Sequence, residues 1–63
     1  MRTFHFVHPC INTAINGVLA RIIQDFPCFI TSNLIRDYTW TEVSINCRIE
    51  DFPAIEQRIA SYL

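Results

Sequence analysis

The stretch "HFVHPC" concentrates side chains that can do chemistry. His5, His8 and Cys10 lie close together, and imidazole nitrogens and thiolates are common zinc ligands. Cys28 or Cys47 could complete a set of four. On a strand, however, His5 and His8 are three positions apart and point to opposite faces. We therefore predict a histidine at a strand end rather than a metal site, and we assign neither a metal nor a cofactor.

A cysteine nucleophile is the second chemical possibility, with Cys10 beside His8 as its base. A thiol near a helix N-terminus is more acidic than usual, but such a pair also needs a third group that orients the base. The nearby sequence supplies none. We therefore expect Cys10 to be a small packed thiol, as free cysteines often are.

The acidic residues are dispersed along the chain. The adjacent pair Glu50-Asp51 favours a helix N-terminus, where negative charge is stabilising, over a catalytic pair. The single glycine, Gly17, falls within a helical pattern, so the chain has no phosphate-binding loop. We assign no catalytic residue, and an enzyme remains open only as a subunit whose site forms between copies.

The composition is unusually apolar for so short a chain. Of 63 residues, 51% are hydrophobic and 17% are charged, against about 25% charged in ordinary domains. A chain this short buries only about 60% of the surface that its unfolded form exposes. We therefore expect part of the apolar surface to be covered by another chain, in a homo-oligomer or by a protein partner.

Charge and cysteine usage exclude several classes of partner. The formal net charge is −1, there is no lysine, and the arginines are scattered. Nucleic-acid binding requires a basic patch, so we predict no direct nucleic-acid partner. The apolar stretch 11–23 is too short and too polar to span a membrane. Three cysteines, with no Cys-x-x-Cys pair and no signal peptide, indicate reduced thiols and a cytoplasmic location.

Hydrophobic periodicity predicts the elements that would position these side chains. Residues 3–8 alternate as a strand, with Phe4 and Phe6 on one face. Residues 10–26 carry an apolar stripe at helical spacing, and we expect Gly17 to allow close packing of that helix on a sheet. Residues 28–36 form a second strand, and "RDYT" at 36–39 forms a hairpin connection.

The C-terminal third alternates first and then becomes helical. Residues 40–49 form a third strand, and the positions predicted to face the core are Val43, Ile45, Cys47 and Ile49. Asp51 is a good helix N-cap and Pro53 suits a first turn. A second helix is then predicted to the end of the chain, with its apolar stripe at Phe52, Ile55, Ile59 and Tyr62 or Leu63.

The predicted order is β-α-β-β-α in one small α+β domain, residues 1–63. Right-handed crossover places the third strand beside the first, so we expect a three-stranded mixed sheet of order 1-3-2 with both helices on one face. This is a ferredoxin-like arrangement without its fourth strand. The strand at 3–8 is left as an edge with unpaired backbone groups, and we predict that it pairs with a second copy or another protein.

The stretch "FPCFITSNLIRDYTWTEVSINCRIEDFPAIEQRIASYL" resembles small ferredoxin-like regulatory domains. It is similar to the ligand-sensing domain of Lrp/AsnC transcription factors and, more loosely, to ACT domains. Asp37-Tyr38 and residues 51–63 follow their hairpin and helix pattern, whereas Arg36 and Thr39 replace a glycine and an acid. The resemblance implies dimerisation through sheets and a ligand at a subunit junction, but no binding residue is carried over.

The outer face of the sheet is the candidate functional surface. The residues predicted to form it are His5, Tyr38, Trp40, Glu42, Ser44, Asn46 and Arg48. Exposed Trp and Tyr beside Arg are typical of interface hot spots. A plain solvated face, a protein contact and a small-ligand site remain open. We predict a cytoplasmic accessory or regulatory module that acts by protein–protein contact; a small-molecule sensor and a subunit of an oligomeric enzyme are the alternatives.

Overall fold

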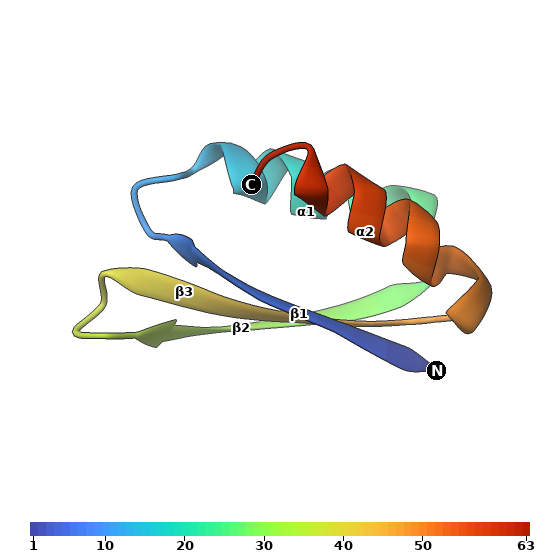
Figure 1. Ribbon diagram of the computed structural model, residues 1–63, viewed down its shortest axis with the longest axis horizontal. Helices are drawn as coiled ribbons and strands as arrows, with labels where there is room; N and C mark the ends of the chain where they lie inside the picture. The colour runs from blue at the N-terminus through green and yellow to red at the C-terminus, as the bar shows by residue number, and fades with distance from the viewer.

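The computed structural model describes residues 1–63 and consists of a three-stranded sheet with two helices on one of its faces (Figure 1). The elements in chain order are β1 (Arg2–Pro9), α1 (Ala14–Asp25), β2 (Cys28–Ile35), β3 (Trp40–Cys47), a 3-10 turn η1 (Ile49–Asp51) and α2 (Phe52–Ala60). The predicted α+β class and the order β-α-β-β-α are confirmed.

The strand order is β1-β3-β2, as predicted. The expected mixed sheet is corrected in one respect, because both ladders are antiparallel. Strands β1 and β2 run in the same direction, but β3 lies between them and no parallel ladder forms. As a result, both β1 and β2 are edge strands.

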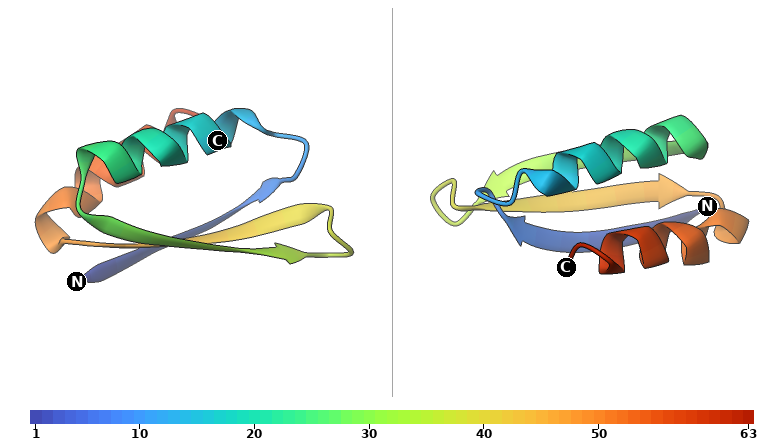
Figure 2. Two further views of the ribbon diagram at one scale, coloured as in Figure 1. Left: turned by 180° about the vertical axis from the view of Figure 1, so that it is seen from behind. Right: turned by 90° about the horizontal axis from the view of Figure 1, so that it is seen from above.

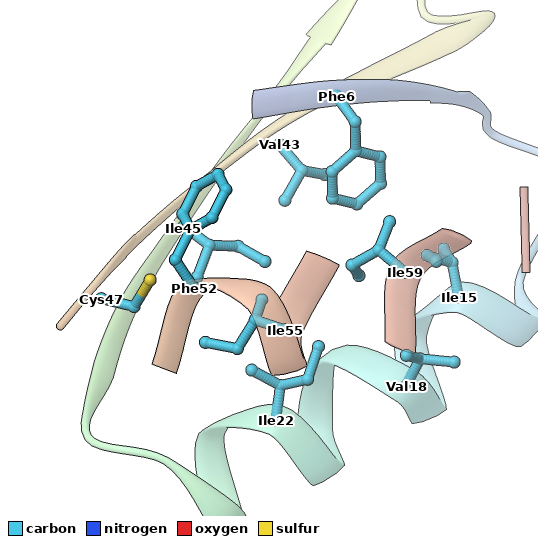
Figure 3. Close-up of a cluster of buried hydrophobic side chains, with 10 residues drawn as sticks. All are labelled: Phe6, Ile15, Val18, Ile22, Val43, Ile45, Cys47, Phe52, Ile55 and Ile59. Atoms are coloured by element: carbon cyan, nitrogen blue, oxygen red, sulfur yellow. The ribbon is translucent and has the colours of Figure 1, made fainter. Parts of the chain in front are cut away.

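The core lies between the sheet and the helices (Figure 3). Its buried members are Phe6, Ile15, Val18, Ile22, Val43, Ile45, Cys47, Phe52, Ile55 and Ile59. The inward face of β3 was therefore predicted correctly as far as Cys47. Ile49 was predicted wrongly, since its side chain is 66% exposed. The strand ends at Cys47 and the chain turns into η1, so the alternation no longer sets which way Ile49 points.

The helices are shorter than their sequence patterns. The N–H of Cys10 donates to the carbonyl of Thr39 at 3.0 Å, which keeps Cys10 beside the sheet, and α1 begins only at Ala14. Asp51 does precede α2, but its side chain makes no cap hydrogen bond. Its carboxylate instead accepts a hydrogen bond from Arg48 Nε at 2.8 Å.

Gly17 does not mediate close packing, contrary to prediction. The buried side of α1 is formed by Ile15, Val18 and Ile22, and Gly17 is exposed. A Cβ placed on Gly17 would meet nothing within 4 Å. A sequence pattern shows that a glycine lies in a helix, but its neighbours depend on tertiary packing.

The helices divide the inner face between them. Seen from above, α1 lies on the β2 side and α2 on the β1 side, and the β2–β3 hairpin extends beyond both (Figure 2). Ser32 and Leu34, on the inner face of β2, are accordingly exposed. One half of an edge strand is thus left without cover.

Candidate interaction surface

The side of the sheet opposite the helices has no covering element (Figures 1 and 2). We call this side the outer face. Since successive strand residues alternate, it carries the residues between the buried ones. Its members, read from the two ladders, are Thr3, His5, Val7 and Pro9 of β1, Trp40, Glu42, Ser44 and Asn46 of β3, and Phe29, Thr31, Asn33 and Ile35 of β2.

Four of the residues predicted from sequence meet in the middle of the outer face. His5 lies directly opposite Ser44 in the ladder, and His5 Nε2 is 3.5 Å from Glu42 Oε2. Asn46 Oδ1 accepts a hydrogen bond from the hydroxyl of Thr3. The centre of the face is therefore polar and offers hydrogen-bond donors and acceptors together with the carboxylate of Glu42.

Trp40 marks the hairpin end of the outer face. It lies between Pro9 and Ile35, its partners in the two ladders, and it is half-buried. The guanidinium carbon of Arg36 is 5.2 Å from the centre of the Trp40 ring system, within the range of a cation–π contact. A partly exposed aromatic ring with an adjacent cation thus lies at this end of the outer face.

The hairpin that follows β2 has an unusual backbone. Arg36, Asp37 and Tyr38 have φ values of 53°, 55° and 66°, a left-handed conformation that costs non-glycine residues about 1–2 kcal/mol each. Thr39 contributes a backbone N–H and a hydroxyl that both donate to the carbonyl of Arg36. This turn holds Tyr38 with 76% of its surface exposed.

Arg48 lies apart from the other predicted surface residues. It follows the end of β3, and its Nε is 2.8 Å from Asp51 Oδ2 and 3.2 Å from Glu50 Oε1. These carboxylates neutralise Arg48 at the turn into α2. The structure therefore brings His5, Glu42, Ser44, Asn46 and Trp40 onto one face but leaves Arg48 beyond its edge.

The contribution of β2 to the outer face was missed in the sequence analysis. Phe29, with 64% of its surface exposed, is the largest apolar side chain that β2 contributes to this face. Strand 28–36 alternates weakly because β2 is an edge strand with exposed residues on both faces. A signal was present nonetheless: the connection at 36–39 places Ile35 opposite Trp40, and that pairing assigns every second residue of β2 to the outer face.

The histidines and Cys10 of the N-terminal segment have different surroundings. His5 and His8 point to opposite faces, as predicted. His8 is 4% exposed, and its Nδ1–H donates to the carbonyl of Pro9 at 2.9 Å. Cys10 Sγ is 3.3 Å from the hydroxyl of Thr41. No group of three or more His, Cys, Asp or Glu side chains is arranged to hold a metal ion.

The remaining thiols are poorly suited to nucleophilic chemistry. Cys28 and Cys47 are opposite one another in the β2–β3 ladder, on the inward side. Burial raises the pKa of both thiols, and for Cys28 the neighbouring Cys47 raises it further. Since the thiolate is the reactive form, both groups are disfavoured as nucleophiles.

One shallow hollow lies on the helix side of the molecule. The residues that line it are Gly17, Val18, Arg21, Arg58, Ser61 and Tyr62, around a volume of about 420 Å³. Arg58 is already engaged, since its Nη1 donates to Asp25 Oδ2 at 2.6 Å. The hollow shares no residue with the outer face.

Neither helix is long and apolar enough to cross a membrane.

Comparison of the chain with protein-family models, with curated proteins and with solved structures finds no match in any of the three. The resemblance to Lrp/AsnC-type and ACT domains therefore rests on the residue pattern alone. What the chain does must be argued from its own surfaces.

Proposed function

We propose that the protein is an accessory or regulatory module that acts by binding another protein through the outer face of its sheet. The observation that carries this proposal is the uncovered outer face, which combines Trp40 and Phe29 with a polar centre around His5 and Glu42. Both helices lie on the other side (Figure 2), so nothing within the chain covers this surface.

The composition of the face supports a protein partner over a small ligand. Protein interfaces are enriched in Trp, Tyr and Arg at their energetic centres and surround them with polar groups. At the hairpin end, Arg36 lies against the Trp40 ring, and Tyr38 is exposed in the same turn. The one hollow found in the molecule lies on the helix side and shares no residue with this face, whereas small-molecule sites are concave and enclose their ligands.

The polar centre supplies specificity rather than affinity. The His5–Glu42 pair is half-exposed on both side chains, and such exposed pairs contribute about 0–1 kcal/mol. Next to this pair on β3, the side chains of Ser44 and Asn46 can donate and accept hydrogen bonds. A partner must match this pattern, because polar groups buried without partners are costly.

Site-specific photo-cross-linking in the cell that makes the protein tests the proposal. A photoreactive phenylalanine is introduced at Ser44, in the centre of the outer face, or at Ala20, which is exposed on α1. We expect one protein to be captured from position 44 and not from position 20. Trp40→Ala should weaken the capture about thirty-fold, the effect of losing a hot spot of about 2 kcal/mol.

A matched aromatic variant controls for non-specific effects. Tyr62→Ala removes an aromatic ring that is 52% exposed at the end of the helical layer, and we expect it to leave the capture unchanged. Equal capture from both positions, or capture that ignores Trp40→Ala while the fold is intact by circular dichroism, would exclude the outer face as the binding surface.

A further inference from the structure

The two edges of the sheet differ in how well they are protected. The β1 edge carries Arg2, two histidines and Pro9, and charges and prolines are devices that block edge pairing. The β2 edge, Cys28–Ile35, has the sequence CFITSNLI. It contains no charge, no proline and no glycine. A long, uncharged and exposed edge is a template for another strand.

Exposed apolar side chains flank this same edge. Phe29 is 64% exposed on the outer side and Leu34 is 56% exposed on the inner side. Ile23 of α1, 55% exposed, lies about 200° around the helix from Asp25, and Asp25 bonds to α2. Ile23 therefore faces away from α2, over the β2 side of the sheet.

The order of polar and apolar residues in β2 is symmetric. From Phe29 to Ile35 the residues run apolar, apolar, polar, polar, polar, apolar, apolar, and Ser32 is at the centre. A strand that pairs antiparallel with its own copy meets the same sequence reversed. A two-fold interface must be complementary to itself, and this pattern meets that requirement.

We propose that two copies of the chain pair antiparallel through β2, with Ser32 opposite Ser32 of the second copy. In this register Phe29 faces Ile35 of the second copy on the outer side, and Ile30 faces Leu34 on the inner side. Thr31 faces Asn33. Apolar residues meet apolar ones and polar residues meet polar ones along the whole ladder.

Other registers are less favourable. With Thr31 opposite itself, Phe29 would face Asn33 and Ile30 would face Ser32, so that both of these apolar residues would meet a polar one. A shift by a single residue places the inner face of one copy against the outer face of the other. The proposed register keeps the helices of both copies on the same side of the joined sheet. The side of each α1 that carries Ile23 then faces Leu34 of the other copy.

Pairing would also extend the outer face. Trp40 is opposite Ile35 in the β2–β3 ladder, so the row continues from Pro9 through Trp40 and Ile35 to Phe29 of the second copy. This apolar row exists only in the dimer and occurs twice, once on each side of the two-fold axis. Its use as a binding surface rests on the proposed function, whereas the pairing itself does not.

Paired charge variants at the two-fold axis test this register. Ser32→Lys and Ser32→Glu are purified, mixed in equal amounts and analysed by native mass spectrometry. Opposite charges facing each other across strands are favourable by about 0.2–1 kcal/mol and like charges are unfavourable. Random pairing would make half of all dimers heterodimers. We expect more than this, with a ratio of heterodimer to homodimers about two- to five-fold above the ratio for random pairing.

The corresponding pair on the other edge is the control. Thr3 is exposed on β1, and a mixture of Thr3→Lys and Thr3→Glu should give the statistical proportions. A statistical mixture from the Ser32 variants, or monomers from wild type, would overturn the proposal. An excess from the Thr3 variants instead would move the pairing to β1. All of these measurements use the purified chain alone, so their failure is distinct from failure of the cross-linking experiment.

Discussion

Arg58 and Asp25 join the two helices by a hydrogen bond of 2.6 Å from Nη1 to Oδ2. Arg58 also lies 4.9 Å from the centre of the Phe26 ring, so one guanidinium contacts the carboxylate at the end of α1 and the aromatic ring that follows it. The hydrogen bond from Arg58 is the main reason why the pKa of Asp25 lies below its usual range, and the charges of Arg58 and Arg21 act in the same direction.

The Asp25–Arg58 pair should make stability depend on acidity. A pKa that is lower in the folded chain than the ordinary value of about 3.9 favours folding while Asp25 is ionised. This contribution is complete above that value and is lost as the pH falls through the depressed pKa. We expect Asp25→Asn to lower the melting temperature at neutral pH and to have little effect at about pH 2.

Thermal melts followed by circular dichroism between neutral and acidic pH measure this dependence. Glu56→Gln is the control, since Glu56 is an exposed helical carboxylate that forms no ion pair. It should leave the shape of the pH profile unchanged. If the melting temperature of Asp25→Asn fell with acidification in the same way as that of wild type, Asp25 would not be the source of the pH dependence.

Gly17→Ala should stabilise the chain. Gly17 is in the interior of α1, and a Cβ there meets nothing within 4 Å. Alanine is favoured over glycine inside helices by about 0.5–1 kcal/mol. Ala20→Gly, at another exposed position of α1, should destabilise by a similar amount. Urea denaturation measures both, and a loss of stability in Gly17→Ala would show that something packs against this side of α1.

The two isoleucines at positions 45 and 49 should respond differently to truncation. Ile45 is fully buried and Ile49 is 66% exposed. Replacing a buried isoleucine by alanine costs about 2–5 kcal/mol, which approaches the whole stability of a domain of this size. We expect Ile45→Ala to be largely unfolded by circular dichroism and Ile49→Ala to match wild type within about 0.5 kcal/mol. Similar losses at both positions would place Ile49 in the core.

Tyr38→Gly should stabilise the hairpin. Tyr38 has a φ of 66°, a conformation that glycine adopts without strain. Part of the relief is offset by the greater freedom of glycine in the unfolded chain, and we expect a net gain of about 0.5–1 kcal/mol in urea denaturation. Thr39→Gly should do the opposite, because the hydroxyl of Thr39 donates to the carbonyl of Arg36. A loss in both variants would argue against the left-handed turn.

Local patterns were sufficient to predict most of the fold. Alternation and helical periodicity identified each strand and helix, and the crossover rule placed β3 between β1 and β2. Two of the failures share a cause. The direction of Ile49 and the start of α1 depend on where the chain leaves a regular element, and long-range contacts such as Cys10 to Thr39 decide that. The surroundings of Gly17 depend on tertiary packing, which a helical pattern does not report.

The candidate surface was predicted only in part for a related reason. The residues of β3 follow from a clean alternation, so Trp40, Glu42, Ser44 and Asn46 were placed correctly on the outer face. The contribution of Phe29 was missed because β2 has exposed residues on both faces and alternates only weakly, although the pairing of Ile35 with Trp40 across the hairpin assigns Phe29 to the outer face. Arg48 follows the last residue of β3, and its guanidinium is engaged by Glu50 and Asp51 at the turn into α2.

Sedimentation equilibrium of the purified wild-type chain, over a wide range of concentrations, tests the β2 pairing most directly. We expect a reversible dimer, with a mass of twice the 7.4 kDa chain at high concentration and dissociation on dilution. Ser32→Lys should shift this equilibrium toward the monomer, and Thr3→Lys should not. A mass of one chain for wild type at every concentration would contradict self-pairing and would leave the β2 edge to a different protein.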